Sequence, residues 1–128
     1  MKALKILLVD DNNNFRNSAL RFINSNLRFE ILMWASSGEE AIERVNSNDI
    51  GVDLIIMDIS MDGINGLEAA KRIRAVNKTV KIILLTISDN LEYKDMAINV
   101  GADDFISKFE FTDMLIPTVN KIFEGRLN

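Results

Sequence analysis

Residues 4–11 read LKILLVDD, an apolar run with one lysine near its start and two aspartates at its end. Two further runs have the same form, because residues 54–58 read LIIMD and residues 82–86 read IILLT. A strand with one exposed face alternates apolar and polar residues, whereas an unbroken apolar run is typical of a strand buried on both faces. The three runs therefore predict parallel strands at the centre of a sheet that helices cover on both sides.

Weaker apolar stretches and amphipathic segments complete a regular alternation along the chain. Strands are predicted at residues 4–9, 29–35, 54–57, 80–85 and 105–106. Each strand is followed by a segment whose apolar residues recur with helical spacing. Short connections and right-handed crossovers convert this (βα)5 order into a doubly wound, flavodoxin-like α/β fold. We expect the strand order 2-1-3-4-5.

Three positions mark helix ends. Ser37 and Glu40 have the spacing of a capping box, so a helix is predicted to begin there. Gly101 follows the fourth helical segment and is expected to be its left-handed cap. Thr112 is expected to cap the fifth helix. Pro117 lies within the pattern of that helix, which predicts either a kink or a later start.

Composition limits the chemistry available to this chain. The 128 residues predict one domain, and they include no cysteine and no histidine. Disulfides, Cys/His zinc sites, a Ser-His-Asp triad and an internal phosphohistidine are therefore excluded. The 15 basic and 19 acidic residues give a net charge of −4, which disfavours nucleic acid as a partner of this domain. No apolar run approaches the roughly 20 residues of a membrane span, so we expect a cytoplasmic protein without a membrane partner.

Polar residues follow the predicted strands at the edge where their carboxyl ends would meet. They are Asp10, Asp11, Asp58, Thr86 and Lys108. Ligands of open α/β sheets bind at this edge, at the point where the strand order reverses. Taken singly, each residue has a structural explanation, since Asp forms turns and caps, Thr suits strands and Lys is usually solvated. Together they predict one acidic site with a cation beside it.

Three carboxylates held close together repel one another and require a compensating cation. Lys108 supplies one positive charge, and Mg²⁺ is suited to oxygen ligands that it shares with a phosphate. The carboxylate of Asp58 can act as a nucleophile toward phosphorus and form an acyl phosphate. Lys108 and the hydroxyl of Thr86 could then contact the phosphoryl oxygens.

The chain resembles the receiver domain of bacterial two-component response regulators over essentially its whole length. The resemblance rests on residues 6–11 (ILLVDD), 58–61 (DISM), 64–67 (INGL), Thr86 and 101–103 (GAD) leading to Lys108. It implies roles for seven residues: Asp58 as phosphoacceptor, Asp11 as a direct Mg²⁺ or Mn²⁺ ligand, Asp10 as a ligand through water, Ser60 as a ligand through its backbone carbonyl, Lys108 as neutralising cation, Thr86 as a switch residue and Phe105 as the aromatic switch. A histidine kinase would donate the phosphoryl group. Such a domain is not a conventional enzyme, because it catalyses only its own phosphorylation and dephosphorylation.

Residues 65–69 (NGLEA), Glu92-Tyr93 and 122–125 (IFEG) resemble the NarL/FixJ, or LuxR-type, branch of that family. Its members usually carry a DNA-binding domain after the receiver and control transcription. The expected organisation is therefore a single receiver domain at 1–128, with an interdomain linker that starts at 124–128. Whether the domain stands alone or belongs to a longer regulator is left open, as is a homodimer.

Four positions depart from the family pattern. Asp62 replaces the usual proline and is expected to point to solvent. Ile87 replaces a small residue, which leads to the hypothesis of a long-lived phosphoryl group. Phe109 follows Lys108 where proline is common, so a cis peptide bond is less assured there. Phe105 has no phenol hydroxyl, so it can switch through packing only.

These departures keep one alternative open, a degenerate receiver that binds proteins without being phosphorylated. Two other functions are disfavoured. A phosphatase of the haloacid dehalogenase type needs a second aspartate where Ser60 stands. A flavin carrier needs a first loop that accepts phosphate, and Asp10 and Asp11 would repel it.

Overall fold

A computed structural model describes residues 3–47, 51–87 and 91–123. Its five strands are all parallel and form one sheet in the order β2-β1-β3-β4-β5. They are β1 (Leu4–Val9), β2 (Phe29–Ala35), β3 (Leu54–Asp58), β4 (Lys81–Thr86) and β5 (Asp104–Ser107). The predicted fold class and strand order are confirmed.

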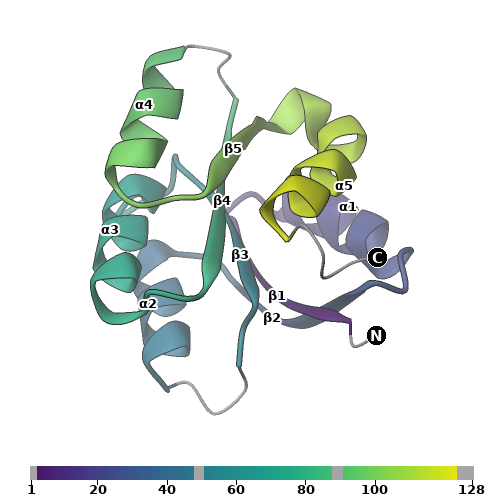
Figure 1. Ribbon diagram of the computed structural model, residues 1–128, viewed down its shortest axis with the longest axis horizontal. Helices are drawn as coiled ribbons and strands as arrows, with labels where there is room; N and C mark the ends of the chain where they lie inside the picture. Colours follow the sequence, from purple (N-terminus) through teal and green to yellow (C-terminus); the bar gives the residue numbers. More distant parts are fainter. Residues whose placement is uncertain (1–2, 48–50, 88–90, 124–128) are drawn as a thin grey trace.

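Helices cover both faces of the sheet (Figure 1). One face packs against α1 (Asn13–Asn24) and α5 (Phe111–Ile122). The other packs against α2 (Gly38–Ser47), α3 (Gly66–Val76) and α4 (Leu91–Asn99). A short 3-10 helix, η1 (Lys108–Glu110), leads from β5 into α5.

The unbroken apolar runs divide between two separate cores. In β1, Ile6 and Leu8 pack toward α1 and α5, whereas Leu7 and Val9 pack toward the opposite layer of helices. The same alternation holds in β3 and β4, whose side chains are all buried apart from Lys81. Because both faces of these strands are covered by helices, no polar residue follows Lys5 in β1 or Lys81 in β4 before the carboxyl end.

The helix ends predicted at Ser37 and Gly101 are confirmed. The Oγ of Ser37 accepts a hydrogen bond from the amide of Glu40 at 3.1 Å. Gly101 has a φ of 90°, and its amide donates to the carbonyl of Ile98 while that of Ala102 donates to Ala97. This pair of bonds closes α4 with a left-handed glycine cap.

The start predicted for the fifth helix is wrong. Ser107 caps the preceding 3-10 helix by accepting from the amide of Phe109 at 3.3 Å, and α5 begins at Phe111, so Thr112 lies inside it. The helix also continues through Pro117 rather than starting after it. Pro117 and Asp113 both lie on the exposed side of α5, where water can satisfy the Asp113 carbonyl that the proline leaves without an amide partner.

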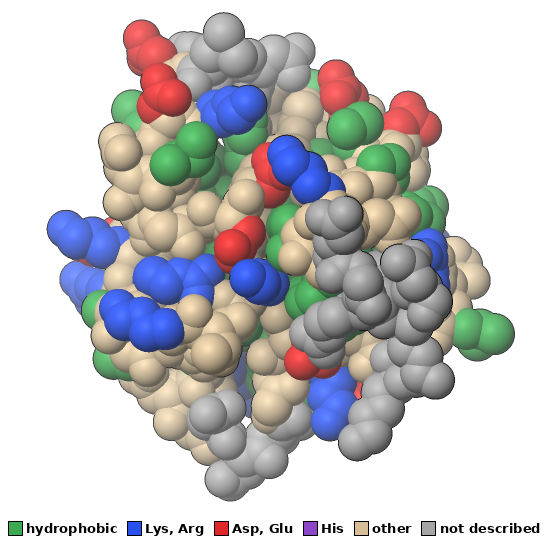
Figure 2. All heavy atoms as spheres, in the orientation of Figure 1, with side chains coloured by type: hydrophobic (Ala, Val, Ile, Leu, Met, Phe, Trp, Pro, Cys, Tyr) green, Lys and Arg blue, Asp and Glu red, His purple; other side chains and the backbone are tan. Residues whose placement is uncertain are grey.

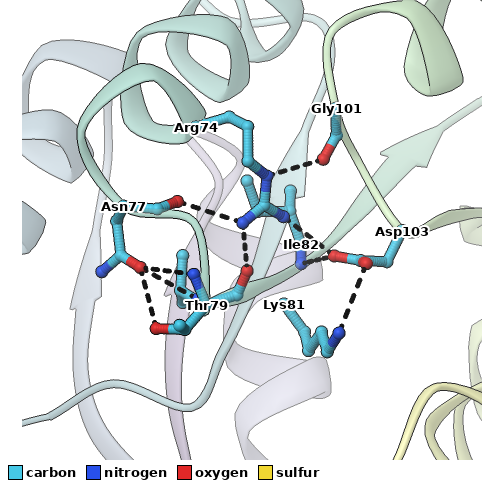
Figure 3. A network of polar contacts seen from close by, with 8 residues as sticks. Arg74, Asn77, Thr79, Lys81, Ile82, Gly101 and Asp103 are labelled. Carbon is cyan, nitrogen blue, oxygen red and sulfur yellow. Dashed lines mark hydrogen bonds and ion pairs between the residues drawn. The ribbon is translucent and has the colours of Figure 1, made fainter.

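A polar network explains why β4 begins at Lys81 and not at Val80 as predicted (Figure 3). The amide of Val80 donates to Asn77 Oδ1 at 3.0 Å, and its carbonyl accepts from Arg74 at 2.6 Å. Val80 is therefore committed to the turn before the strand. Arg74 also donates to the carbonyl of Gly101 and to Asp103, which joins the end of α3 to the loop that precedes β5.

The lengths of the helices and the charges on the surface bear on possible partners. None of the described helices is both long and apolar enough to cross a membrane. On the face shown in Figure 2, lysine and arginine side chains gather over α3, and acidic side chains lie among them and along the upper edge. Because the chain as a whole carries a net charge of −4, this basic group is a local feature.

Candidate functional site

Three aspartates converge at the carboxyl ends of β1 and β3. Asp10 and Asp11 follow β1, and Asp58 is the last residue of the neighbouring strand β3. One carboxylate oxygen from each lies within 4.8 Å of the others. Asp10 is fully buried and Asp58 is 4% exposed, whereas Asp11 is open to solvent. The predicted acidic cluster is thus present in the fold.

Lys108 lies between two of the three acids. Its Nζ is 2.8 Å from Oδ2 of Asp10 and 3.1 Å from Oδ2 of Asp58. The side chain is 11% exposed, and the ammonium also lies 4.6 Å from the centre of the Phe15 ring in α1. Lys108, the first residue of η1, therefore pairs with both buried carboxylates.

Burial dominates the electrostatics of this cluster. It raises the pKa of Asp58 above its usual value, and the nearby charge of Asp10 raises it further, while Lys108 and the amide of Ser60 oppose the change. For Lys108, burial acts to lower the pKa, but the hydrogen bonds and charges of Asp10 and Asp58 outweigh it and raise the pKa. The three carboxyl groups outnumber the single lysine beside them.

The loop after β1 holds Asp10 by its backbone and side chain. The amide of Asp10 donates to the carbonyl of Ala35 at 3.0 Å, which extends the pairing of β1 with β2. Its Oδ1 accepts from the amide of Asn12 at 2.8 Å. Asn12 in turn caps α1, because its Oδ1 accepts from the amide of Phe15 at 2.9 Å. The cap therefore fixes the start of α1 against the acidic site.

The loop after β3 shapes the other side of the site. The amide of Ser60 donates to Oδ1 of Asp58 at 3.1 Å, and the amide of Asp62 donates to Oδ2 of Asp11 at 3.3 Å. Gly66 closes the loop, and a Cβ at this position would collide with the carbonyl oxygen of Asp58. Only glycine allows α3 to start so close to the end of β3.

The donor set fits a hard divalent cation. Oδ2 of Asp10 is buried, and its partner among the described residues is the ammonium of Lys108, which Asp58 shares. An open cleft of about 490 Å³, lined by residues that include Asp11, Ser60 and Asp62, leads to the cluster. Carboxylates beside an open, polar space are the ligands that Mg²⁺ prefers.

A family model described as "Response regulator receiver domain" matches residues 6–120. The chain is a response regulator receiver domain. Its fold and its acidic cluster agree with this assignment. The resemblance inferred from the sequence motifs is therefore confirmed.

Similar proteins place this receiver domain in the NarL/FixJ type. It is 32% identical over 124 residues to the nitrate/nitrite response regulator protein homolog of Haemophilus influenzae, covering 97% of this chain and 59% of that one. It is 30% identical to the response regulator UvrY of Escherichia coli, covering 96% and 56%. A LuxR-family DNA-binding response regulator structure from Staphylococcus aureus aligns with a TM-score of 0.83 and 26% identity, covering 93% and 98%. The chain spans less than two thirds of the length of the first two relatives.

The receiver domain brings the predicted switch residues Thr86 and Phe105 to the same face of the sheet. Thr86 is buried at the end of β4, opposite Ser107 of β5, and Phe105 pairs with Leu84. Because side chains alternate along a strand, Thr86 shares the face of Leu84, where Phe105 packs among the residues beneath α2, α3 and α4. Phe105 is only half-buried.

Three of the four departures from the family pattern are exposed to solvent. Asp62 is exposed, as expected. Ile87 follows β4 and is 65% exposed, so its side chain borders solvent. Phe109 is 80% exposed, and no peptide bond in the described ranges, including the one after Lys108, is cis.

Arg16 is not among the predicted site residues, and the apolar spacing of the first helix accounts for Phe15 as a core residue but not for its contact with Lys108. Arg16 is 7% exposed although it is charged, and Phe15 supports Lys108. A signal for Arg16 was available, because it lies three and seven residues before Ala19 and Ile23, which are buried on the inner face of α1. An arginine at that spacing lies on the face that packs against the core.

Proposed function

We propose that this receiver domain accepts a phosphoryl group on Asp58 from the phosphohistidine of a partner kinase. One observation carries the proposal: Lys108 bridges Asp10 and Asp58 in a cluster of three carboxylates whose outer member, Asp11, faces an open cleft. A purely structural ion pair needs one acid for each base. Here the excess of acidic groups provides for a further cation, and that cation would in turn favour a phosphoryl group at Asp58.

In the transfer, a carboxylate oxygen of Asp58 attacks phosphorus, and a phosphorus–oxygen bond forms as the phosphorus–nitrogen bond of the donor breaks. The imidazole nitrogen keeps the electron pair of the broken bond and takes a proton from solvent. Lys108, already 3.1 Å from Asp58, is positioned to neutralise charge on the transferred group. The hydroxyl of Thr86 would contact a second phosphoryl oxygen.

Asp10, Asp11, Asp58 and the backbone carbonyl of Ser60 would hold Mg²⁺ or Mn²⁺. When bound, the ion supplies positive charge to the phosphoryl oxygens. The residues of the chain orient the ligands, because the amides of Asn12 and Ser60 donate hydrogen bonds to the two buried carboxylates. Asp11, held by the amide of Asp62, presents its carboxylate at the rim.

Phosphorylation would be read out through Thr86 and Phe105. The two side chains share one face of the sheet, and Phe105 lines a cleft between α4 and β5 of about 130 Å³. A shift of Thr86 toward the new phosphoryl group would leave space for the Phe105 ring to move inward. The site and the surface near α4 would then behave as one two-state element.

The partners and the larger protein are part of the same proposal. We take residues 1–128 as a single receiver domain with a histidine kinase as donor, a second copy as a further partner and transcription control as the output through a DNA-binding domain. The relatives, which are longer regulators, support this. The linker expected at 124–128 lies outside the described residues. The proposal includes a cytoplasmic location and no chemistry beyond self-phosphorylation and dephosphorylation.

The test is phosphorylation of the purified chain by acetyl phosphate, followed by intact mass with and without Mg²⁺. We expect one added phosphoryl group, dependent on Mg²⁺ and released by hydroxylamine, as an acyl phosphate should be. Asp58→Asn should abolish the gain. Asp62→Asn is the matched control, because it makes the same change on an exposed acid at the rim, and both its phosphorylation and its Mg²⁺ affinity should equal those of the wild type.

Two results would overturn the proposal. One is a wild-type chain that gains no mass with Mg²⁺, which would favour the degenerate receiver; the family match and the intact cluster do not favour that alternative now. The other is a phosphorylated Asp58→Asn variant, which would move the acceptor elsewhere. A large gain of Mg²⁺ affinity in Asp62→Asn would show that Asp62 faces the site.

A further inference from the structure

Arg16 connects the acidic site to the edge of the sheet. Its Nη1 donates to the backbone carbonyl of Asp10 at 2.8 Å in a buried contact, and its Nη2 donates to Oδ1 of Asn13 at 2.6 Å. The guanidinium lies over the ring of Trp34 in β2, 4.1 Å from its centre. Trp34 is 46% exposed and is the only tryptophan of the chain.

This arrangement requires arginine. A guanidinium is planar, so it can stack on an indole while two of its nitrogens donate in different directions, whereas the ammonium of lysine is a single point of charge. The Nε of Arg16 is buried without a hydrogen bond among the described residues.

The contact completes the fixation of the Asp10 backbone. Ala35 holds the amide of Asp10 from β2, and Arg16 holds its carbonyl from α1. With both backbone groups held, the backbone of Asp10 has a set position, from which its carboxylate reaches the amide of Asn12 and the ammonium of Lys108. We propose that Arg16 is a positioning residue for cation binding and that Trp34 senses the occupied site through it. The inference rests on the proposed function, since it takes the cluster to be the cation site.

Positioning and simple electrostatics predict opposite results. If Arg16 acts only as a nearby positive charge, removing it in Arg16→Gln should strengthen Mg²⁺ binding, and Arg16→Lys should change nothing. If it positions Asp10, both variants should weaken Mg²⁺ binding, because each loses the fork that joins Asp10 to Asn13. Changes to residues that orient metal ligands commonly cost about tenfold in affinity.

The experiment compares the wild type, Arg16→Lys, Arg16→Gln and the matched control Arg21→Lys, an exposed arginine of the same helix. Mg²⁺ affinity is measured by competition against Mn²⁺, whose free ion gives an EPR signal independent of tryptophan. Trp34 emission is followed in a parallel MgCl₂ titration. We expect both Arg16 variants to bind about tenfold more weakly. Trp34 should respond in the wild type and in Arg21→Lys but stay silent in both Arg16 variants at saturating Mg²⁺.

Three outcomes would contradict the inference alone while leaving the proposed function in place. They are unchanged affinity in Arg16→Lys, tighter binding in Arg16→Gln, and a wild-type Trp34 that is silent although EPR shows bound metal. The last needs no variant, so the inference can fail even if the Arg16 variants do not fold. A wild-type chain that binds neither ion would overturn the proposed function as well.

Discussion

The ammonium of Lys108 lies 3.1 Å from Oδ2 of Asp58, across the gap between η1 and the end of β3. This contact ties the last strand of the sheet to its central strand at the carboxyl edge. Two influences oppose each other on the pKa of Asp58, because burial favours the protonated acid and Lys108 favours the carboxylate. The raised pKa of Asp58 shows that burial and the charge of Asp10 prevail.

Asp58→Asn should stabilise the metal-free fold at neutral pH. Because the folded pKa of Asp58 is raised above 3.8, the stability contributed by its proton is fully present below that pH and is lost as pH rises through the folded pKa. At pH 7 the asparagine removes the cost of the buried charge. We expect a gain of about 1 kcal/mol, or about 4 °C in Tm, measured by circular dichroism in EDTA.

The gain should disappear below pH 3.8, where wild-type Asp58 is protonated in both states. Asp62→Asn serves as the control and should stay within about 0.5 kcal/mol of the wild type at every pH. A variant Asp58→Asn that is less stable than the wild type at pH 7 would mean that Lys108 outweighs burial.

Lys108→Gln should destabilise the fold at pH 7 by about 3 kcal/mol, because it leaves two buried carboxylates without their cation. Urea unfolding measures this loss. The raised pKa of Lys108 means that its contribution is present below pH 10.5 and is lost as pH rises through the folded pKa. The wild type should therefore lose stability above pH 10.5 through this group, and the variant should not.

Lys121→Gln is the matched control for Lys108→Gln. Lys121 also pairs with an acid, Asp104 at 3.7 Å, but its side chain is 79% exposed. We expect a change of less than about 0.5 kcal/mol there. Equal losses in the two lysine variants would contradict a special role for the buried bridge.

Gly101→Ala should destabilise the fold more than Gly51→Ala. Both glycines have positive φ, 90° and 69°, so both substitutions carry a backbone cost of about 1–2 kcal/mol. A Cβ at Gly51 would meet nothing within 4 Å, whereas one at Gly101 would lie 2.7 Å from Cγ of Arg74. Arg74 cannot easily yield, because it is bonded to Gly101, Asn77, Val80 and Asp103 (Figure 3).

Thermal unfolding of the two glycine variants separates backbone strain from the collision. The free energy of unfolding of Gly51→Ala should exceed that of Gly101→Ala by more than about 1 kcal/mol. Equal losses would indicate that the Arg74 network adapts to an added methyl group.

Ile87→Ala should shorten the lifetime of phosphorylated Asp58. Ile87 directly follows Thr86 at the end of β4 and carries a bulky, mostly exposed side chain. Smaller side chains at this point would admit water more easily, and a barrier lower by about 1 kcal/mol corresponds to roughly fivefold faster hydrolysis. Loss of the phosphoryl mass over time measures the rate, and hydrolysis no faster in Ile87→Ala would refute the idea.

The sheet and the acidic cluster were predictable because both follow from strand ends. Unbroken apolar runs gave the positions of β1, β3 and β4, and the residues after them had to meet at one edge. Val80 and Thr112 were misplaced for a common reason. In both cases a hydrogen bond that local patterns do not reveal decides where the element begins. Arg74 donates to the carbonyl of Val80, and Ser107 caps the short helix that runs into α5 ahead of Thr112.

The contacts of Arg16 could not be derived from the sequence in the same way. Helical spacing places it on the inner face of α1, but its partners are a carbonyl of another loop and a tryptophan of an edge strand. Side-chain to backbone contacts of this kind depend on how two elements dock, and docking is decided by the whole core. The end of a strand can be predicted from neighbouring residues, whereas the docking of α1 on the sheet cannot.

The acidic cluster joins Asp10 and Asp58, which belong to different strands and are distant along the chain. In the denatured ensemble these carboxylates are apart, so a cation held by all of them is a ligand of the native state alone. Mass action then couples ion concentration to conformational free energy, worth about 2.7 kcal/mol at a hundred times Kd. The melting temperature of the domain should consequently track the magnesium content of its surroundings.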